Sequence, residues 1–157
     1  MDILSEVESV IREELEIVEI DRSNEEQSIQ FSIRVKGVDL VMVCWLESDS
    51  LLLKVSCFPR DLELPDSRRA ELMEFATLQS LNDRFGYSLV INNLFVHNSF
   101  CFVMDNSIDR SVVELLVRDG IHAVVEAYPG LVSIISHGKT AKEAMDEEDE
   151  RRRKASN

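Results

Sequence analysis

Apolar side chains recur every three or four residues at the start of the chain, with acidic side chains between them. The apolar positions within residues 2–15 are Ile3, Leu4, Val7, Val10, Ile11 and Leu15. This spacing predicts an amphipathic helix. Asp2 is a suitable N-cap, because its carboxylate can accept a hydrogen bond from a backbone N–H of the first turn. The polar run at residues 21–26 predicts a loop after this helix.

Over residues 28–58 the period changes from helical to alternating. Apolar and polar residues alternate over residues 29–35 and again over residues 51–57, which is typical of strands with one buried face. Residues 40–46, between them, are apolar at every position. Because the connections are short and polar, we expect an antiparallel meander of three strands with turns at residues 36–39 and 47–50.

Helical periodicity returns after the meander. A second helix is expected from Asp66 or Ser67 to about Phe85, with Gly86 as its end. A β-hairpin is expected over residues 87–105. Its turn is placed at Asn98-Ser99, and Asn92-Asn93 is an alternative site for it.

The last part of the chain predicts two further helices. The third helix opens at Asp109 or Ser111 and is broken at Tyr128-Pro129-Gly130. An apolar stretch, LVSII, then leads to Gly138 and a highly charged helix. Because this charged segment has almost no apolar stripe, residues from about 139 onward are expected to pack little against the rest of the chain.

The order of elements predicts the fold class. Runs of strands separated by single helices indicate an α+β fold, with helices on an antiparallel sheet of about five strands in the order α-βββ-α-ββ-α. A length of 157 residues suits one hydrophobic core. We therefore expect a single domain over residues 1–138 and a charged helix or tail over residues 139–157.

This arrangement resembles the class I type III secretion chaperones and the related YbjN-like proteins. The features that carry the resemblance are the acidic first helix, the three strands at 28–58 and the segment LNDRFGYSLVIN at 81–92. The similarity covers roughly residues 1–135, and the charged tail departs from the pattern. The resemblance implies a homodimer that binds an extended segment of another protein.

Charge is unevenly distributed along the chain. The formal net charge is −13, and ten of the 30 acidic residues but only two of the 17 basic residues lie within residues 1–26. An acidic surface repels phosphate groups, so nucleic acid and anionic membranes are disfavoured as partners. The acidic residues can also serve simply to keep the protein soluble.

The chain is expected to be cytoplasmic. No apolar run reaches the roughly 18 residues that a membrane-spanning helix requires, and the first residues lack the basic start and apolar block of a signal peptide. The three cysteines, Cys44, Cys57 and Cys101, are odd in number and form no CxxC pair. They are interpreted as small buried side chains in a reducing compartment.

We find no spacing in the sequence that predicts catalysis, a cofactor or a metal. His97, His122 and His137 have no partner at HxxxH or HExxH spacing. Asp105 and Asp109 flank a loop but match no calcium-binding pattern, so a role in the turn or at the helix start is favoured. We therefore expect neither an enzyme nor a metal protein.

The unusual feature is an excess of apolar residues on two strands. If helices cover one face of the meander, the other face should be polar, yet five large apolar residues would point there: Val41, Val43, Trp45, Phe100 and Phe102. An exposed apolar patch usually marks an interface. The alternative is that another segment, such as LVSII, covers this second face.

Together these observations favour a non-catalytic module that binds protein. The preferred function is a homodimeric chaperone or adaptor that holds a segment of a partner protein. The main alternative is a small regulatory or stress-response domain that acts through self-association or through a single protein partner. An enzyme is the third possibility.

Overall fold

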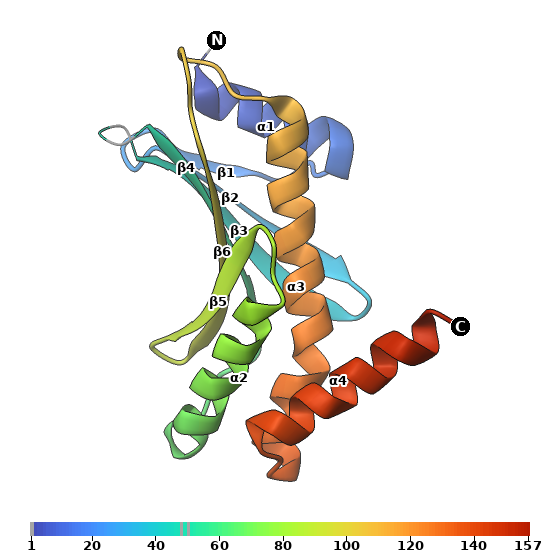
Figure 1. Cartoon of the computed structure of the whole chain (residues 1–157). Helices are drawn as coiled ribbons and strands as arrows, with labels where there is room; N and C mark the ends of the chain where they lie inside the picture. The colour runs from blue at the N-terminus through green and yellow to red at the C-terminus, as the bar shows by residue number, and fades with distance from the viewer. Residues whose placement is uncertain (1, 48, 50) are drawn as a thin grey trace.

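The computed structural model describes residues 2–47, 49 and 51–157 of the chain (Figure 1). Within these residues four α-helices and one antiparallel sheet of six strands form an α+β fold, which confirms the predicted fold class. The elements are α1 (Ile3–Leu15), β1 (Asp21–Ser23), β2 (Ser28–Val35), β3 (Val38–Glu47), β4 (Leu52–Pro59), η1 (Asp66–Arg68), α2 (Arg69–Leu81), β5 (Gly86–Ile91), β6 (Leu94–Phe102), α3 (Arg110–His137) and α4 (Ala141–Ala155).

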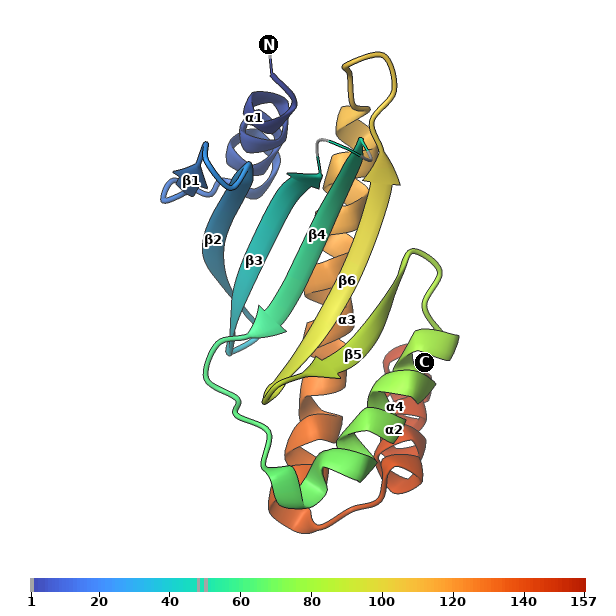
Figure 2. The same ribbon diagram turned by 90° about the vertical axis from the view of Figure 1, so that its left-hand side faces the viewer.

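The strands lie in the order β1-β2-β3-β4-β6-β5, and every neighbouring pair is antiparallel. The predicted meander is therefore present as β2, β3 and β4. Of its predicted second turn at 47–50, residues 48 and 50 lie outside the described residues. The chain then leaves the sheet through α2 and returns as the β5–β6 hairpin, with β6 beside β4. Figure 2 shows the strands from one side, with α3 behind them.

Helices α1 and α3 lie on one side of the sheet and bury its inner face, whereas α2 packs beside β5 and α4 packs against α2 and α3 (Figures 1 and 2). Alternate residues of the central strands point toward α1 and α3 because successive side chains of a strand face opposite sides. The core formed there includes, among its fully buried members, Leu40, Met42, Cys44, Leu53, Val113 and Val124. Asp2 caps α1 as predicted, with its carboxylate 2.8 Å from the amide of Ser5.

The sheet has one strand more than expected, because residues 21–23 form β1 rather than a loop. Arg22 lies opposite Ile29 in the register. Its guanidinium contacts Asp2 at 3.1 Å and the Ser5 hydroxyl at 3.0 Å, both at the start of α1. Polar side chains thus hold this short edge strand, and no hydrophobic alternation marked it in the sequence.

Two predicted boundaries in the middle of the chain are wrong. Helix α2 ends at Leu81, before the predicted end near Phe85. The hairpin turns at the alternative site, Asn92-Asn93, and not at Asn98-Ser99. Asn92 adopts a left-handed conformation, with φ of 52°, which asparagine tolerates well.

Helix α3 does not break at Tyr128-Pro129-Gly130, contrary to the prediction. It runs unbroken over 28 residues with Pro129 inside it. Packing outweighs the local cost of proline, because Ala127, Leu131 and Ile134 on either side are fully buried. The LVSII stretch therefore forms the last turns of α3, next to α2 and α4.

Helix α4 packs against α2 and α3, so the expectation of a loosely attached tail is wrong. Ala141 and Ala144 are fully buried, and Met145 and Glu148 nearly so. A capping box at Thr140 starts the helix. Small side chains allow α4 to approach closely, and this contact needs no broad apolar stripe. None of the described helices is long and apolar enough to cross a membrane.

Candidate functional site

The outer face of the sheet, opposite the helices, carries the predicted interface residues. The register places Trp45 of β3 opposite Lys54 of β4 and Lys54 opposite Phe100 of β6. Val43 occupies the equivalent position two residues earlier. No helix of the described part of the chain covers this face, which is turned toward the viewer in Figure 2.

The five predicted residues share this face but differ in exposure. Val41 is only 7% exposed, whereas Phe100 and Phe102 are 48% and 67% exposed. Val43 and Trp45 are half-buried. The rings of Phe100 and Phe102 meet edge to face, with centroids 6.4 Å apart. The accessible part of the surface is thus centred on β6 and the end of β3.

A shallow depression of about 320 Å³ lies between these strands and β5. Its lining includes Trp45, Phe58, Tyr87 and Phe100. Three of its polar side chains are already paired, since Ser56 donates a hydrogen bond to Asn98 and Lys54 forms an ion pair with Glu47. The depression therefore offers mainly apolar contact to a ligand.

The two edges of the sheet are less available than its outer face. Strand β1, at one edge, has only three residues. At the other edge, the Ser80 hydroxyl of α2 accepts from the Ser88 amide at 2.8 Å and donates to the Ser88 carbonyl at 3.0 Å. These contacts occupy backbone groups that an added strand would need.

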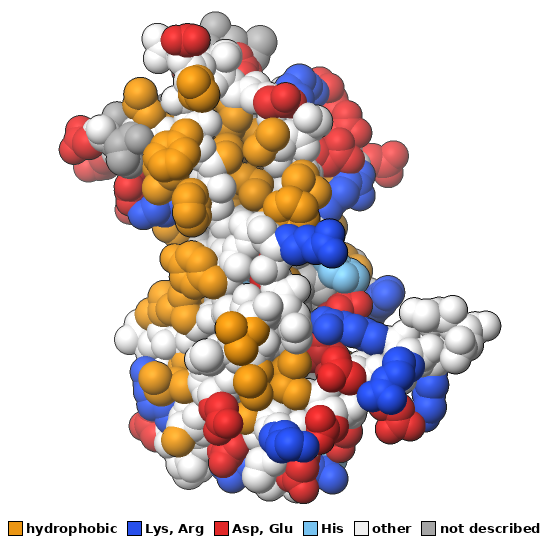
Figure 3. All heavy atoms as spheres, in the orientation of Figure 1, with side chains coloured by type: hydrophobic (Ala, Val, Ile, Leu, Met, Phe, Trp, Pro, Cys, Tyr) orange, Lys and Arg blue, Asp and Glu red, His pale blue; other side chains and the backbone are white. Residues whose placement is uncertain are grey.

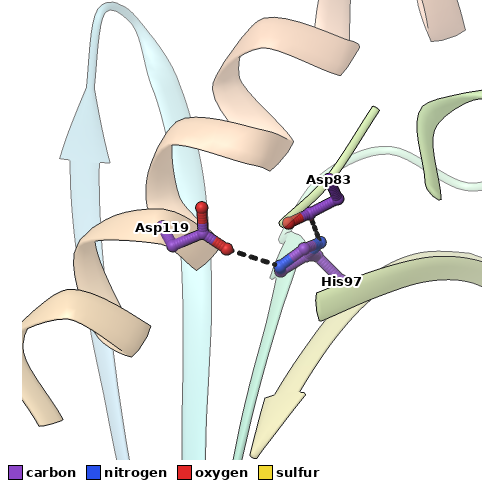
Figure 4. Close-up of side chains that lie close together, drawn as sticks. All are labelled: Asp83, His97 and Asp119. Carbon is purple, nitrogen blue, oxygen red and sulfur yellow. Dashed lines mark hydrogen bonds and ion pairs between the residues drawn. The ribbon is translucent and has the colours of Figure 1, made fainter. Parts of the chain in front are cut away.

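A second candidate site lies on the inner side of the sheet. His97 of β6 is fully buried, and each nitrogen of its ring faces a carboxylate (Figure 4). Nδ1 is 3.3 Å from Asp83, in the loop between α2 and β5, and Nε2 is 3.2 Å from Asp119 of α3. The three side chains offer ligand atoms that all lie within 4.8 Å of one another. We call them the Asp83–His97–Asp119 cluster.

The surroundings of the cluster fix its geometry. Oδ1 of Asp83 accepts hydrogen bonds from the amides of Phe85 and Gly86, at 2.9 and 3.1 Å. Gly86 lies so close to the imidazole that a Cβ there would be 2.8 Å from Nε2 of His97. The same Cβ would lie closer still to the backbone carbonyl oxygen of Asn98, so glycine is required by the close approach of β5 to β6 at this point, and not as a stop signal for α2.

Burial raises the pKa of Asp119 above its ordinary value, and the negative charge of Asp83 raises it further, while His97 acts in the opposite direction. Asp83 and Asp119 border a surface pocket of about 510 Å³ that also contains His122, Glu126 and Arg152. The cluster therefore has a route to solvent although the imidazole itself is buried.

No spacing in the sequence indicated this cluster, because His97 has no partner at a recognised motif spacing and meets the two aspartates only in the folded chain. Its members come from a loop, a strand and a helix, at positions with no recognisable motif spacing. One signal was available, because a histidine within an otherwise apolar strand must find polar partners when it is buried. The expectations for Asp109 and for the cysteines agree better with the structure. Asp109 caps α3, with its carboxylate 2.9 Å from the Ser111 amide. Cys44 and Cys57 are buried free thiols as expected, whereas Cys101 is partly exposed.

Comparison with known proteins supports the fold. No family model and no curated protein sequence matches this chain. The crystal structure of YbjN from E. coli, a candidate transcription regulator, superposes with a TM-score of 0.55. The two chains share 13% sequence identity over 80% of this chain and 91% of YbjN. The chain thus has a YbjN-like fold, as the resemblance in sequence pattern implied.

Proposed function

We propose that this chain is a non-catalytic protein-binding module of the cytoplasm, a chaperone or adaptor that holds an apolar segment of a partner protein. The observation that carries this proposal is the uncovered outer face of the sheet, where Phe100 and Phe102 project into solvent. Exposed aromatic groups of this size are costly in water and usually mark interfaces.

The partner is expected to lie across the face of the sheet. The depression between Trp45, Tyr87 and Phe100 can accept one apolar side chain of a bound polypeptide. Burying apolar surface contributes about 25 cal/mol per Å² before the cost of association is subtracted. Figure 3 shows hydrophobic side chains gathered over the upper ends of β4 and β6, with charged side chains over α1 and α4.

The fold similarity favours one alternative function. Because YbjN is a candidate transcription regulator, this chain could belong to a regulatory system. The net charge of −13 disfavours direct contact with nucleic acid. In this alternative the outer face binds a single regulatory protein or a second copy of the chain.

The test compares proteins that co-purify with tagged variants from the native host. The variant Phe100→Lys/Phe102→Lys places two charges on the outer face, and both positions are exposed enough for the protein to fold. Leu81→Lys is the matched control, because Leu81 is 76% exposed at the end of α2, away from this face. We expect a specific partner with the wild type and with Leu81→Lys, lost with the double variant.

Binding is then measured with the purified partner by calorimetry, and a loss of at least about tenfold in affinity is expected for the double variant. Equal affinity of the wild type and the double variant would contradict the proposal. Turnover by the purified chain in a broad substrate screen would instead favour an enzyme.

A further inference from the structure

The contacts of His97 pose a problem of hydrogen bonding. A neutral imidazole carries one N–H and one lone pair. Nevertheless Nδ1 and Nε2 each face a carboxylate oxygen, at 3.3 and 3.2 Å. Only one of these contacts can be an N–H···O hydrogen bond. In the tautomer with the proton on Nε2, the Ser88 hydroxyl at 3.3 Å can donate to Nδ1. In the tautomer with the proton on Nδ1, facing Asp83, the lone pairs of Nε2 and Asp119 meet unless a proton or a cation lies between them.

We propose that the Asp83–His97–Asp119 cluster is a binding site for a divalent transition metal ion, with Zn²⁺ as the best fit. The ion lies between Nε2 of His97 and the carboxylate of Asp119. Imidazole nitrogen and carboxylate oxygen are ordinary zinc ligands. Water from the adjoining pocket completes the coordination.

Asp83 has a separate role in this arrangement, as the partner of Nδ1–H. Two backbone amides hold its other oxygen, and the Ser88 hydroxyl lies 3.3 Å from Nδ1 on the same side of the ring. A metal-binding histidine commonly donates its second N–H to a carboxylate, which fixes the tautomer and makes Nε2 a better ligand. The structure supplies this partner before any ion binds.

The charge of the cluster also favours a divalent cation. Two carboxylates, those of Asp83 and Asp119, flank the single imidazole of His97. No lysine or arginine of the described residues forms an ion pair with Asp83 or Asp119. A divalent ion between His97 and Asp119 would supply positive charge where no described lysine or arginine pairs with either carboxylate.

The experiment is calorimetric titration of chelator-treated protein with Zn²⁺ at neutral pH. We expect one ion per chain and a rise in melting temperature on binding. Asp119→Asn should weaken binding more than about tenfold, and Asp83→Asn about 10–100-fold through the tautomer. Asp105→Asn is the matched control, since Asp105 is exposed and distant from the cluster in the fold; its binding should equal that of the wild type.

One further variant separates the cluster from a nearby surface histidine. His122 is exposed on α3 near the same pocket, so His122→Ala separates the cluster from adventitious binding to a surface histidine. Binding that is lost with His122→Ala but kept with Asp119→Asn would overturn the proposal. Circular dichroism checks that each variant is folded, and Co²⁺ absorption reports nitrogen and oxygen ligation independently of stability.

A proton is the competing occupant of the gap between His97 and Asp119. If Zn²⁺ does not bind the wild type at about 100 µM, a concentration well above the micromolar range of specific sites, the metal proposal is wrong. An effect of Asp119→Asn on the pH dependence of stability alone would then identify the cluster as an ion pair of a protonated histidine.

Discussion

Two glycines of α3 differ in whether the surrounding side chains leave room for a Cβ atom. Gly120 and Gly130 lie on the buried side of the same helix, but their neighbours differ. A Cβ at Gly120 would lie 3.4 Å from Cβ of Cys57, an ordinary van der Waals distance. A Cβ at Gly130 would lie 2.5 Å from Cζ of Phe75, which is fully buried and cannot move aside freely.

Alanine substitutions at these two glycines should therefore have opposite effects. Gly130→Ala is expected to destabilise the protein by about 1–3 kcal/mol, because an overpacked core forces side chains from their preferred rotamers. Gly120→Ala should be neutral or stabilising by up to about 1 kcal/mol, because alanine favours helix. Urea unfolding of both variants measures the difference, and a similar loss in both would contradict the packing argument.

At the residue scale the chemistry was harder to predict than the packing. The exposed positions of Phe100 and Phe102 follow from strand alternation, which the sequence contains. The neighbours of His97 do not follow from any sequence pattern, because the path of the chain through α2 and α3 brings Asp83 and Asp119 to it. Residues that meet only through tertiary structure leave no local spacing in a single sequence.

Among the elements, α4 depends most on a buried charged residue. Glu148 is buried between α4 and α2, where Gln79 donates a hydrogen bond to it and Arg152 lies 2.5 Å away. Burial raises the pKa of Glu148 above its ordinary value of 4.5, although Gln79 and Arg152 oppose the shift. The folded protein thus holds this proton more tightly than the unfolded chain does.

The pH dependence of stability follows from the sign of that shift. The contribution of Glu148 is greatest below pH 4.5 and is lost as pH rises through the higher folded-state pKa. We expect Glu148→Gln to gain stability relative to wild type between pH 4 and pH 7, by urea unfolding at each pH. Glu150→Gln is the control, because Lys154 lowers the pKa of Glu150 and the trend should be small and opposite.

Helices and strands were predictable where the hydrophobic period was long, as in α1 and β2–β4. The errors arose where tertiary contacts outweigh local preference. Pro129 remains within α3 because the residues around it are buried. Helix α4 packs through two alanines, which do not form an apolar stripe that could be recognised in a charged segment. Arg22 holds strand β1 through its contacts to α1. These contacts produce no alternation of apolar and polar residues, so the sequence pattern did not predict the strand.

For the molecule as a whole, the layer arrangement decides which surface is free. Helices cover the inner face of the sheet, α2 protects the edge at β5, and the outer face has no cover among the described residues. The sequence predicted an apolar second face from β3 and β6, and the structure places those residues on it together.

A homodimer through this face is the simplest occupant, and sedimentation tests it. Trp45 is half-buried, with the Lys54 ammonium 6.0 Å from its ring centroid, so Trp45→Asp should remain folded. If two outer faces pair, the wild type sediments as a dimer at micromolar concentration and Trp45→Asp as a monomer, because a charge replaces apolar contact.

Val41→Asp is the informative control for that experiment. Val41 lies two positions earlier on the same face as Val43 but is almost fully buried within the chain, so a carboxylate there should cost several kcal/mol and unfold the protein. Circular dichroism should therefore show a folded Trp45→Asp and an unfolded Val41→Asp. A monomeric wild type would exclude the homodimer and leave the outer face to a different protein, whereas loss of structure in Trp45→Asp would show that the face serves stability rather than association.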